Sequence, residues 1–184
     1  MIWTVQTEVG PLTLREQIEP DDEPGLLALF GECDDWFEAT TGGPSGPGDV
    51  QSLFYAVPEG VSLDDKYLFT LRDGERIVGM VDVVARYPDP RSCVIGTFLI
   101  APSHRRSGVA RAVAQVLLSE AREVGFKQVT TTVIDSWPPS AAFAEAMGFE
   151  IGDIIARGGN RRAGEHEATL RRATLNLEGP GDPA

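Results

Sequence analysis

The stretch LIAPSHRRSGVAR, which runs from Leu99 to Arg111, decides how this sequence folds. An apolar segment ends at Pro102, a basic turn of small residues follows, and an amphipathic helix is expected to begin directly after it. Such a junction directs free backbone N–H groups toward one point, beside the positive end of a helix dipole and several arginines. The stretch therefore predicts a strand, a tight turn and a helix that together bind phosphate.

Length and composition are those of one globular domain. The chain has 184 residues, of which 42% are hydrophobic, enough to bury a sizeable core. We expect a single domain over residues 1–177 and a disordered tail over residues 178–184. The first residues lack the basic start of a signal peptide, and no apolar run approaches the ~18–20 residues of a membrane span. We therefore expect a cytoplasmic protein that does not associate with membranes.

Charge and cysteine content limit the classes of partner. The formal net charge of −12 argues against sequence-independent nucleic-acid binding, which needs a basic surface. It is compatible with a cationic substrate, and an acidic surface that only keeps the protein in solution is the alternative. Cys33 and Cys93 lie far apart, and two histidines are too few for a structural zinc site. We expect no metal, and both cysteines to be buried as small apolar residues.

Hydrophobic periodicity predicts strands that alternate with helices. The clearest helix covers residues 107–124 and ends at Gly125, and Asp73-Gly74 predicts a hairpin turn. The apolar face of that helix is expected to hold Val109, Val113, Val116, Leu117, Ala121 and Val124. Expected strands are 12–18, 66–71, 76–87, 93–100, 128–134, 149–156 and 168–177; a helix should begin near residues 20–24 and others cover 34–39 and 138–147, with a loop at 40–49. This order predicts an α/β fold, a mixed sheet with helices on its faces.

Two motifs and a lead-in segment follow one another between Cys93 and Phe149. The lead-in is Phe98–Pro102, the first motif is Arg-x-x-Gly-x-Ala at Arg105–Ala110, and the second is Ala141–Phe149, which ends in Gly-Phe. Their order and spacing resemble the GCN5-related N-acetyltransferase (GNAT) family. The resemblance implies the GNAT acyl-CoA N-acyltransferase fold: a mostly antiparallel central sheet, helices on both faces, and a split between the fourth and fifth strands.

The resemblance also implies a co-substrate, acetyl-CoA, and its position. The thioester would lie in the split between the strands that end at Ile100 and Ile134. The backbone near Leu99 and Ile100 would pair with the pantetheine arm, and Phe143 would pack near the thiol, with burial in the core as its alternative role. The pyrophosphate would be held by the turn residues Arg105, Arg106, Ser107, Gly108, Val109, Ala110 and Arg111.

Two positions depart from the family's motif. The tyrosine that often protonates the departing thiolate is replaced by Ala144, and the asparagine that often precedes that helix is replaced by Trp137. Ser140 lies one helical turn before Ala144 and is the candidate acid, with a helix cap as its alternative role. The strand before the first motif supplies no glutamate. Asp82, which interrupts the apolar strand 77–84, is the candidate base, with a structural ion pair as the alternative.

The acceptor is not identified by any motif. Asp34, Asp35 and Glu38 could select a cation or form a solvated helix face, and the basic residues Arg157–Arg162 could form a solvated hairpin tip or bind an anion. We predict an N-acetyltransferase that moves an acetyl group from acetyl-CoA to an amine of a small molecule or peptide by direct attack. The alternatives are a coenzyme A-binding sensor or regulatory module without turnover, and an O-acyltransferase or longer-chain acyltransferase. The oligomeric state is open, a homodimer included.

Overall fold

One sheet runs through the described part of the chain, residues 1–16, 20–159 and 167–178 of a computed structural model. Its strand order is β1-β2-β3-β4-β5-β6-β8-β7. Neighbouring strands are antiparallel except β5 and β6, which run parallel. The strands are β1 (Ile2–Thr7), β2 (Gly10–Glu16), β3 (Lys66–Asp73), β4 (Arg76–Ala85), β5 (Ser92–Ile100), β6 (Gln128–Ile134), β7 (Glu150–Gly159) and β8 (Glu167–Asn176).

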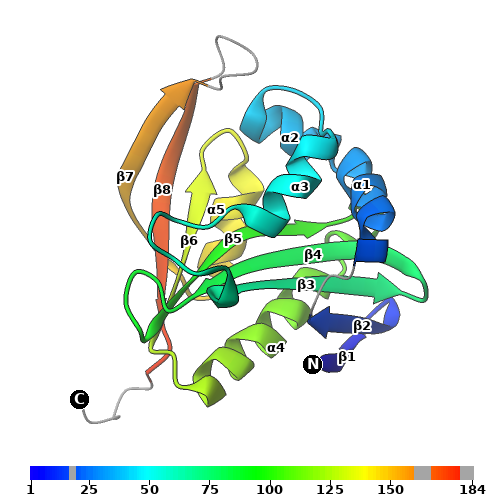
Figure 1. Cartoon of the computed structure of the whole chain (residues 1–184), viewed down its shortest axis with the longest axis horizontal. Coiled ribbons are helices and arrows are strands. Elements are labelled where there is room, and N and C mark those ends of the chain that lie inside the picture. The colour runs from blue at the N-terminus through cyan, green and yellow to red at the C-terminus, as the bar shows by residue number, and fades with distance from the viewer. Residues whose placement is uncertain (17–19, 160–166, 179–184) are drawn as a thin grey trace.

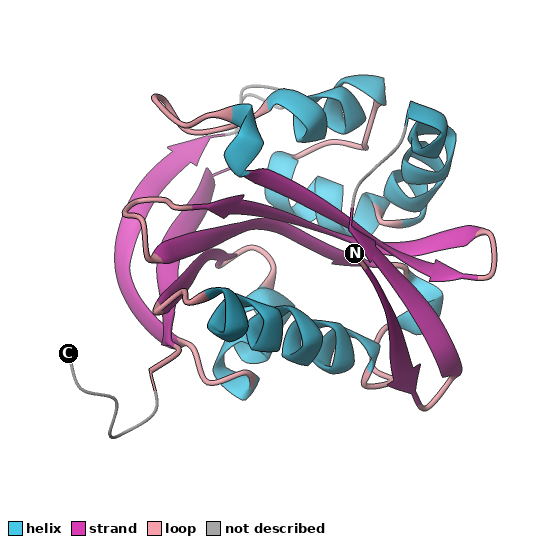
Figure 2. Ribbon diagram, turned by 60° about the horizontal axis from the view of Figure 1, so that its bottom comes forward, coloured by secondary structure: helices cyan, strands magenta, loops and turns pink. Residues whose placement is uncertain are grey.

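Helices cover both faces of this sheet. Helices α1 (Glu23–Glu32), α2 (Asp34–Thr41) and α3 (Pro47–Tyr55) lie over one face, and α4 (Val109–Val124) lies over the other (Figures 1 and 2). Helix α5 (Pro138–Ala146) packs against β6 and β7. Short 3-10 helices lie at Pro20–Asp22, Leu63–Asp65 and Pro102–His104. The mixed, mostly antiparallel sheet with helices on both faces confirms the predicted fold class.

Sequence periodicity located most elements but missed two. The edge strand β1 was not predicted, and α3 begins at Pro47, inside the stretch expected to be a loop. Both elements bury little: in β1 only Val5 is buried, and in α3 only Val50 and Leu53 are. An element with so few buried positions leaves a weak periodic signal, because the period of its apolar residues is what identifies it.

Helix α4 is the longest helix of the described residues, and its ends follow from its glycines. Gly108 (φ 76°) precedes it, and Gly125 (φ 99°) ends it in the left-handed conformation, where its N–H donates to the Ala121 and Arg122 carbonyls. Its buried residues are Val109, Val113, Ala114 and Leu118. The expectation that Val124 joins the buried face is wrong, since Val124 is 68% exposed beyond the end of the packed surface.

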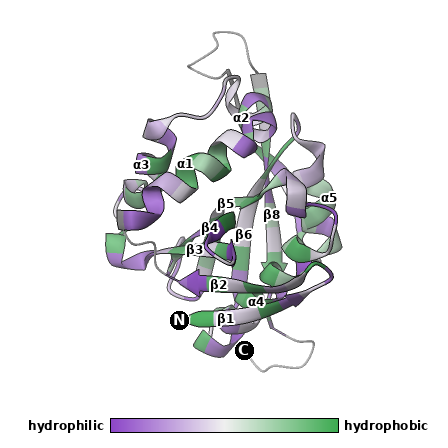
Figure 3. Cartoon of the chain, turned by 90° about the vertical axis from the view of Figure 1, so that its right-hand side faces the viewer, coloured by the Kyte–Doolittle hydropathy of each residue, from purple (hydrophilic) through white to green (hydrophobic). Residues whose placement is uncertain are grey.

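The buried residues form two clusters. The larger lies between β1–β5, the helices α1–α3 and the first half of α4. The smaller joins Leu118 of α4 to β6, β8 and α5. Figure 3 shows hydrophobic residues along α1 and hydrophilic residues on α3. Val83 and Ile95 pack against both clusters, so β4 and β5 mark the boundary between them.

Some expectations concern residues outside the described ranges. Residues 160–166, which include the second half of the basic segment Arg157–Arg162, and the tail 179–184 lie there. Cys33 and Cys93 are both buried, as predicted. No helix of the described residues is long and apolar enough to cross a membrane.

Candidate functional site

The turn before α4 has a backbone suited to binding an anion. Arg106 (φ 57°) and Gly108 (φ 76°) both adopt the left-handed conformation, on either side of Ser107. The Ser107 hydroxyl donates to the carbonyl of His104 at 2.7 Å, which closes the turn onto the preceding 3-10 helix. Alternating backbone conformations of this kind turn successive N–H groups to one side. The first N–H groups of α4 follow directly, and they have no partner within the helix.

Space and charge at this turn also fit a phosphate group. A Cβ placed on Gly108 would meet none of the described atoms within 4 Å, and no side chain caps the first turn of α4. Arg106 and Arg111 are exposed, and within the described ranges neither has a carboxylate at ion-pair distance. The turn thus offers donors, positive charge and room together.

The sheet splits beside this turn. Strands β5 and β6 pair only from Ser92↔Gln128 to Ile95↔Thr131, although β5 continues to Ile100 and β6 to Ile134. The Thr131 hydroxyl donates to the Ile95 carbonyl at 3.0 Å at the last paired position. Beyond that point the two strands leave backbone edges unpaired with each other. This is the split that the resemblance implied between the strands ending at Ile100 and Ile134.

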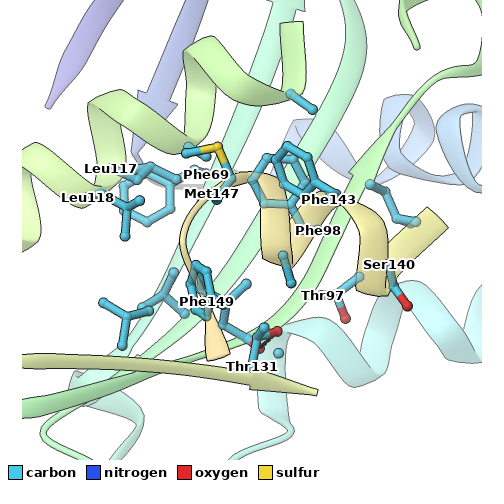
Figure 4. A pocket seen from close by; sticks show the side chains of 18 of the residues that line it. Phe69, Thr97, Phe98, Leu117, Leu118, Thr131, Ser140, Phe143, Met147 and Phe149 are labelled. Atoms are coloured by element: carbon cyan, nitrogen blue, oxygen red, sulfur yellow. Dashed lines mark hydrogen bonds between the residues drawn. The ribbon is translucent and has the colours of Figure 1, made fainter. Parts of the chain in front are cut away.

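One continuous cavity of about 1150 Å³ includes the turn and the split. Phe98 and Phe143 face each other in it, with ring centroids 5.5 Å apart, and Figure 4 shows them beside one another. A smaller hollow of about 370 Å³ lies on the outer side of the turn. Of the predicted coenzyme-binding residues, Ser107 lines this smaller hollow, Val109 is buried, and the others line the large cavity: Leu99, Ile100, Arg105, Arg106, Gly108, Ala110, Arg111 and Phe143.

Comparison with known proteins places this geometry in a family. The model of the acetyltransferase (GNAT) family matches residues 31–149. The chain belongs to the GNAT family. None of the curated proteins matches this sequence.

Solved structures share the GNAT fold. An acetyltransferase from Thermus thermophilus is 22% identical, with a TM-score of 0.69 over 95% of this chain and 99% of that chain. The GNAT domain of S. lividans PAT is 17% identical, with a TM-score of 0.70 over 95% and 96% of the two chains. The Escherichia coli ribosomal-protein-S18-alanine N-acetyltransferase is 15% identical, with a TM-score of 0.66 over 94% and 98%. At these identities the likeness concerns the fold.

Arg105 is turned away from the anion-binding turn of this GNAT protein. Its Nε donates to the Ile100 carbonyl at 2.8 Å, and its Nη1 and Nη2 donate to the two carboxylate oxygens of Asp35 at 2.6 and 3.1 Å. Its guanidinium carbon lies 5.7 Å from the ring centroid of Trp137. Arg105 therefore connects α2, the end of β5 and the start of α5. The positive charge at the turn comes from Arg106 and Arg111; Arg111 donates to the Ala146 carbonyl at 3.5 Å.

Ser140 lines the cavity, but its hydroxyl is already engaged. It donates to the Trp137 carbonyl at 2.8 Å and lies 3.2 Å from the N–H of Ile134, which donates to it. These bonds hold the end of β6 against the first turn of α5. They are not the helix cap that the sequence left as an alternative, because no side chain caps the first N–H groups of α5. Ala144, at the position of the family's tyrosine, is buried in the cavity wall.

Asp82 lies at the split but behind the cavity wall. Its Oδ1 accepts from Lys66 Nζ at 2.8 Å, and it is paired in register with Thr97, which does line the cavity. Burial raises the pKa of Asp82 more than the hydrogen bond and charge of Lys66 lower it. The structure thus contains the ion pair that the sequence left as an alternative. Asp82 lies on β4, the strand next to β5, which borders the split.

Two of the acidic residues of α2, Asp34 and Asp35, have partners within the protein. Arg105 lowers the pKa of Asp35, and Asp34 Oδ1 accepts from both the N–H and the hydroxyl of Ser45. Asp34 and Asp35 are therefore held in contacts within the protein. These contacts connect residues 11 and 70 positions apart in sequence, so no local pattern could predict them.

Sequence reasoning missed the mid-strand opening of β5. That strand is mostly apolar in sequence, yet Gly96 is exposed and its neighbours are only half-buried. The register between β4 and β5 shifts at this point, so that Gly96 is the extra residue of a bulge. A glycine inside an apolar strand is the sequence signal for such a bulge.

Proposed function

We propose that this GNAT protein transfers an acetyl group from acetyl-CoA to an amine of a small molecule or peptide by direct attack. The observation that carries the proposal is continuity: the anion-binding turn at Gly108 opens into the same cavity as the split between β5 and β6. A pyrophosphate at the turn and a thioester at the split are the two ends of one acyl-coenzyme A molecule.

The residues of the turn would hold the coenzyme through its pyrophosphate. Backbone N–H groups around Gly108 and the side chains of Arg106 and Arg111 supply the donors. The backbone of Leu99 and Ile100 borders the cavity where the pantetheine arm would extend the sheet, and Phe143 packs beside Phe98 near the thioester.

The reaction needs no acyl-enzyme. The nitrogen lone pair of the amine attacks the thioester carbonyl carbon, a C–N bond forms, the C–S bond breaks, and coenzyme A leaves as a thiolate that takes up a proton. A lysine-like amine with a pKa of ~10.4 costs roughly 4–5 kcal/mol to deprotonate at pH 7. A base within reach, or a chain of waters, must accept the proton of the amine.

We assign that base to Asp82, which lies behind the cavity wall beside Thr97 and would accept the proton through a chain of waters. Its raised pKa keeps it a stronger base than a solvated aspartate, and Lys66 orients its carboxylate. The thiolate has no tyrosine at Ala144, so its proton comes from water or from the amine itself, with Ser140 as a donor only if its bond to Trp137 opens.

Thiol release tests the proposal directly. Purified protein is mixed with acetyl-CoA and a panel of small amines and lysine-containing peptides, and free coenzyme A is measured together with the mass of the acetylated product. Gly108→Asp is the control, since it should lose coenzyme binding. We expect the wild type, but not Gly108→Asp, to acetylate at least one amine. Release of coenzyme A at the same rate with and without amines would contradict transfer to an amine.

A coenzyme A-binding module without turnover is the second candidate. It is favoured by one observation, that the Ser140 hydroxyl is engaged and Ala144 carries no acid. This function predicts tight binding of acetyl-CoA with no release of thiol for any amine in the panel.

A further inference from the structure

The large cavity continues past the split toward the start of β5, away from the anion-binding turn. Its far end is apolar and is formed by the second half of α4, the residue Phe126 that follows it, the starts of β5 and β6, and the residue before β7. We call this end the apolar extension; it is lined by Cys93, Leu118, Ala121, Phe126, Val129 and Phe149. In Figure 4, Phe149 lies close to Thr131, and Leu118 lies beyond Phe69 and Met147 on the side away from Phe98 and Phe143.

The apolar extension lies between the two buried clusters, which are joined by Val83 and Ile95. Phe69 belongs to the larger cluster and Leu118 to the smaller, and both line the cavity. A domain of this size normally has one contiguous core packed as densely as an organic crystal. Empty apolar volume destabilises a fold, because the lining loses its contacts. An apolar ligand would restore those contacts.

The polar groups near the extension are already engaged. The Thr131 hydroxyl donates to the Ile95 carbonyl, and Glu120 accepts from Trp3 Nε1 at 2.9 Å. Arg86, at the far mouth, is paired with Asp65. Burial alone raises the pKa of the Cys93 thiol to about 11, as expected for a group with little access to water.

The direction of the extension matches that of an acyl chain. Strand β5 runs from Cys93 in the extension to Ile100 beside the turn, so a chain that leaves a thioester at Phe98 away from the pantetheine arm enters the extension. The five steps along the strand from Phe98 to Cys93 span roughly 16 Å at ~3.3 Å per residue. We infer that the apolar extension binds the alkyl chain of acyl-coenzyme A molecules longer than acetyl, an inference that rests on the proposed coenzyme site.

Binding along a series of chain lengths tests the inference without relying on turnover. Coenzyme A and its acetyl, butanoyl, hexanoyl and octanoyl thioesters are titrated into the protein by calorimetry. Affinity should rise by up to about fourfold for each added methylene, from the ~0.8 kcal/mol gained per buried CH₂. Equal affinity for the acetyl and octanoyl thioesters would overturn the inference and leave the proposed function intact. If none of the thioesters binds, both fail.

A variant in which a larger side chain fills the apolar extension can be compared with a matched control. Ala121→Phe adds bulk inside the extension, whereas Ser119→Phe adds the same side chain on the exposed side of α4 and is the control. Ala121→Phe should bind acetyl-CoA like the wild type and lose the gain for hexanoyl and octanoyl chains. Thermal melting verifies that the variant is folded, and Ala121→Leu replaces it if it is not. A chain-length gain that survives in the filled variant places the chain elsewhere and overturns the inference.

Discussion

Replacing Gly108 tests the anion-binding turn most directly. Gly108 has a φ of 76°, a region that costs other residues roughly 1–2 kcal/mol. A Cβ there would meet none of the described atoms within 4 Å, so no steric clash adds to this cost. Gly108→Ala and Gly108→Asp should therefore share a similar loss of stability, seen as a fall in Tm of roughly 2–4 °C per kcal/mol.

The two variants should differ in coenzyme binding. The carboxylate of Gly108→Asp would lie in the open space before α4, where we place a pyrophosphate. Two like charges about 4 Å apart repel by roughly 4 kcal/mol at an effective dielectric constant of ~20, which corresponds to about a 10³-fold loss of affinity. Solvent and salt reduce this figure, so we expect Gly108→Asp to bind acetyl-CoA at least ~100-fold more weakly than Gly108→Ala.

Isothermal titration calorimetry at fixed ionic strength measures both affinities, with thermal melting as the check on folding. The comparison between the two variants removes the effect of backbone strain, since both carry a Cβ in the same left-handed position. Equal affinities of Gly108→Ala and Gly108→Asp for acetyl-CoA would refute the assignment of the pyrophosphate to this turn.

Three further results follow from the site. Ser140→Ala should lower kcat by less than ~100-fold, which is below the range of a dedicated acid. It should also lower Tm, because it leaves the Ile134 N–H without its acceptor. A larger loss of kcat at unchanged Tm would make Ser140 the acid. Asp82→Asn should lower kcat more and remove the acidic limb of the pH–rate profile. Since burial raises the pKa of Asp82, its contribution to stability falls as pH rises through that pKa, and unfolding of Asp82→Asn by denaturant should lack this slope. If the net charge of −12 steers a cationic amine, kcat/KM should fall as salt rises over about 0.05–0.5 M, and a flat profile would exclude steering.

The turn and α4 could be predicted because their determinants are local. The left-handed positions at Gly108 and Gly125, the apolar spacing of α4 and the basic residues between them all lie within one short stretch. The same holds for the hairpin at Gly74 (φ 57°), which joins β3 and β4 as its Asp-Gly pair predicts.

The partners of the site residues could not be predicted, because they come from distant parts of the chain. Arg105 is basic and lies in the phosphate-binding motif, yet its guanidinium bonds to Asp35, 70 residues earlier in the sequence. A bidentate contact with a carboxylate is a strong preference of arginine, and only the packing of α2 against the end of β5 makes that carboxylate available. The cavity likewise is lined by residues of both core clusters, which come from segments far apart in the sequence.

The bulge in β5 explains where the split opens. At Gly96, β5 carries one more residue than β4 opposite it, and a Cβ on Gly96 would lie 2.9 Å from Asp82 Oδ2. Lys66 Nζ holds that carboxylate at 2.8 Å and also donates to the Ala56 carbonyl at 2.7 Å, so Asp82 cannot easily move aside. Pairing between β5 and β6 ends at Ile95, directly before the bulge, because an extra residue twists a strand out of register with its neighbour. The buried ion pair, the glycine and the split are therefore one arrangement, and any substitution of Asp82 acts on the geometry of the cleft as well as on its proton chemistry.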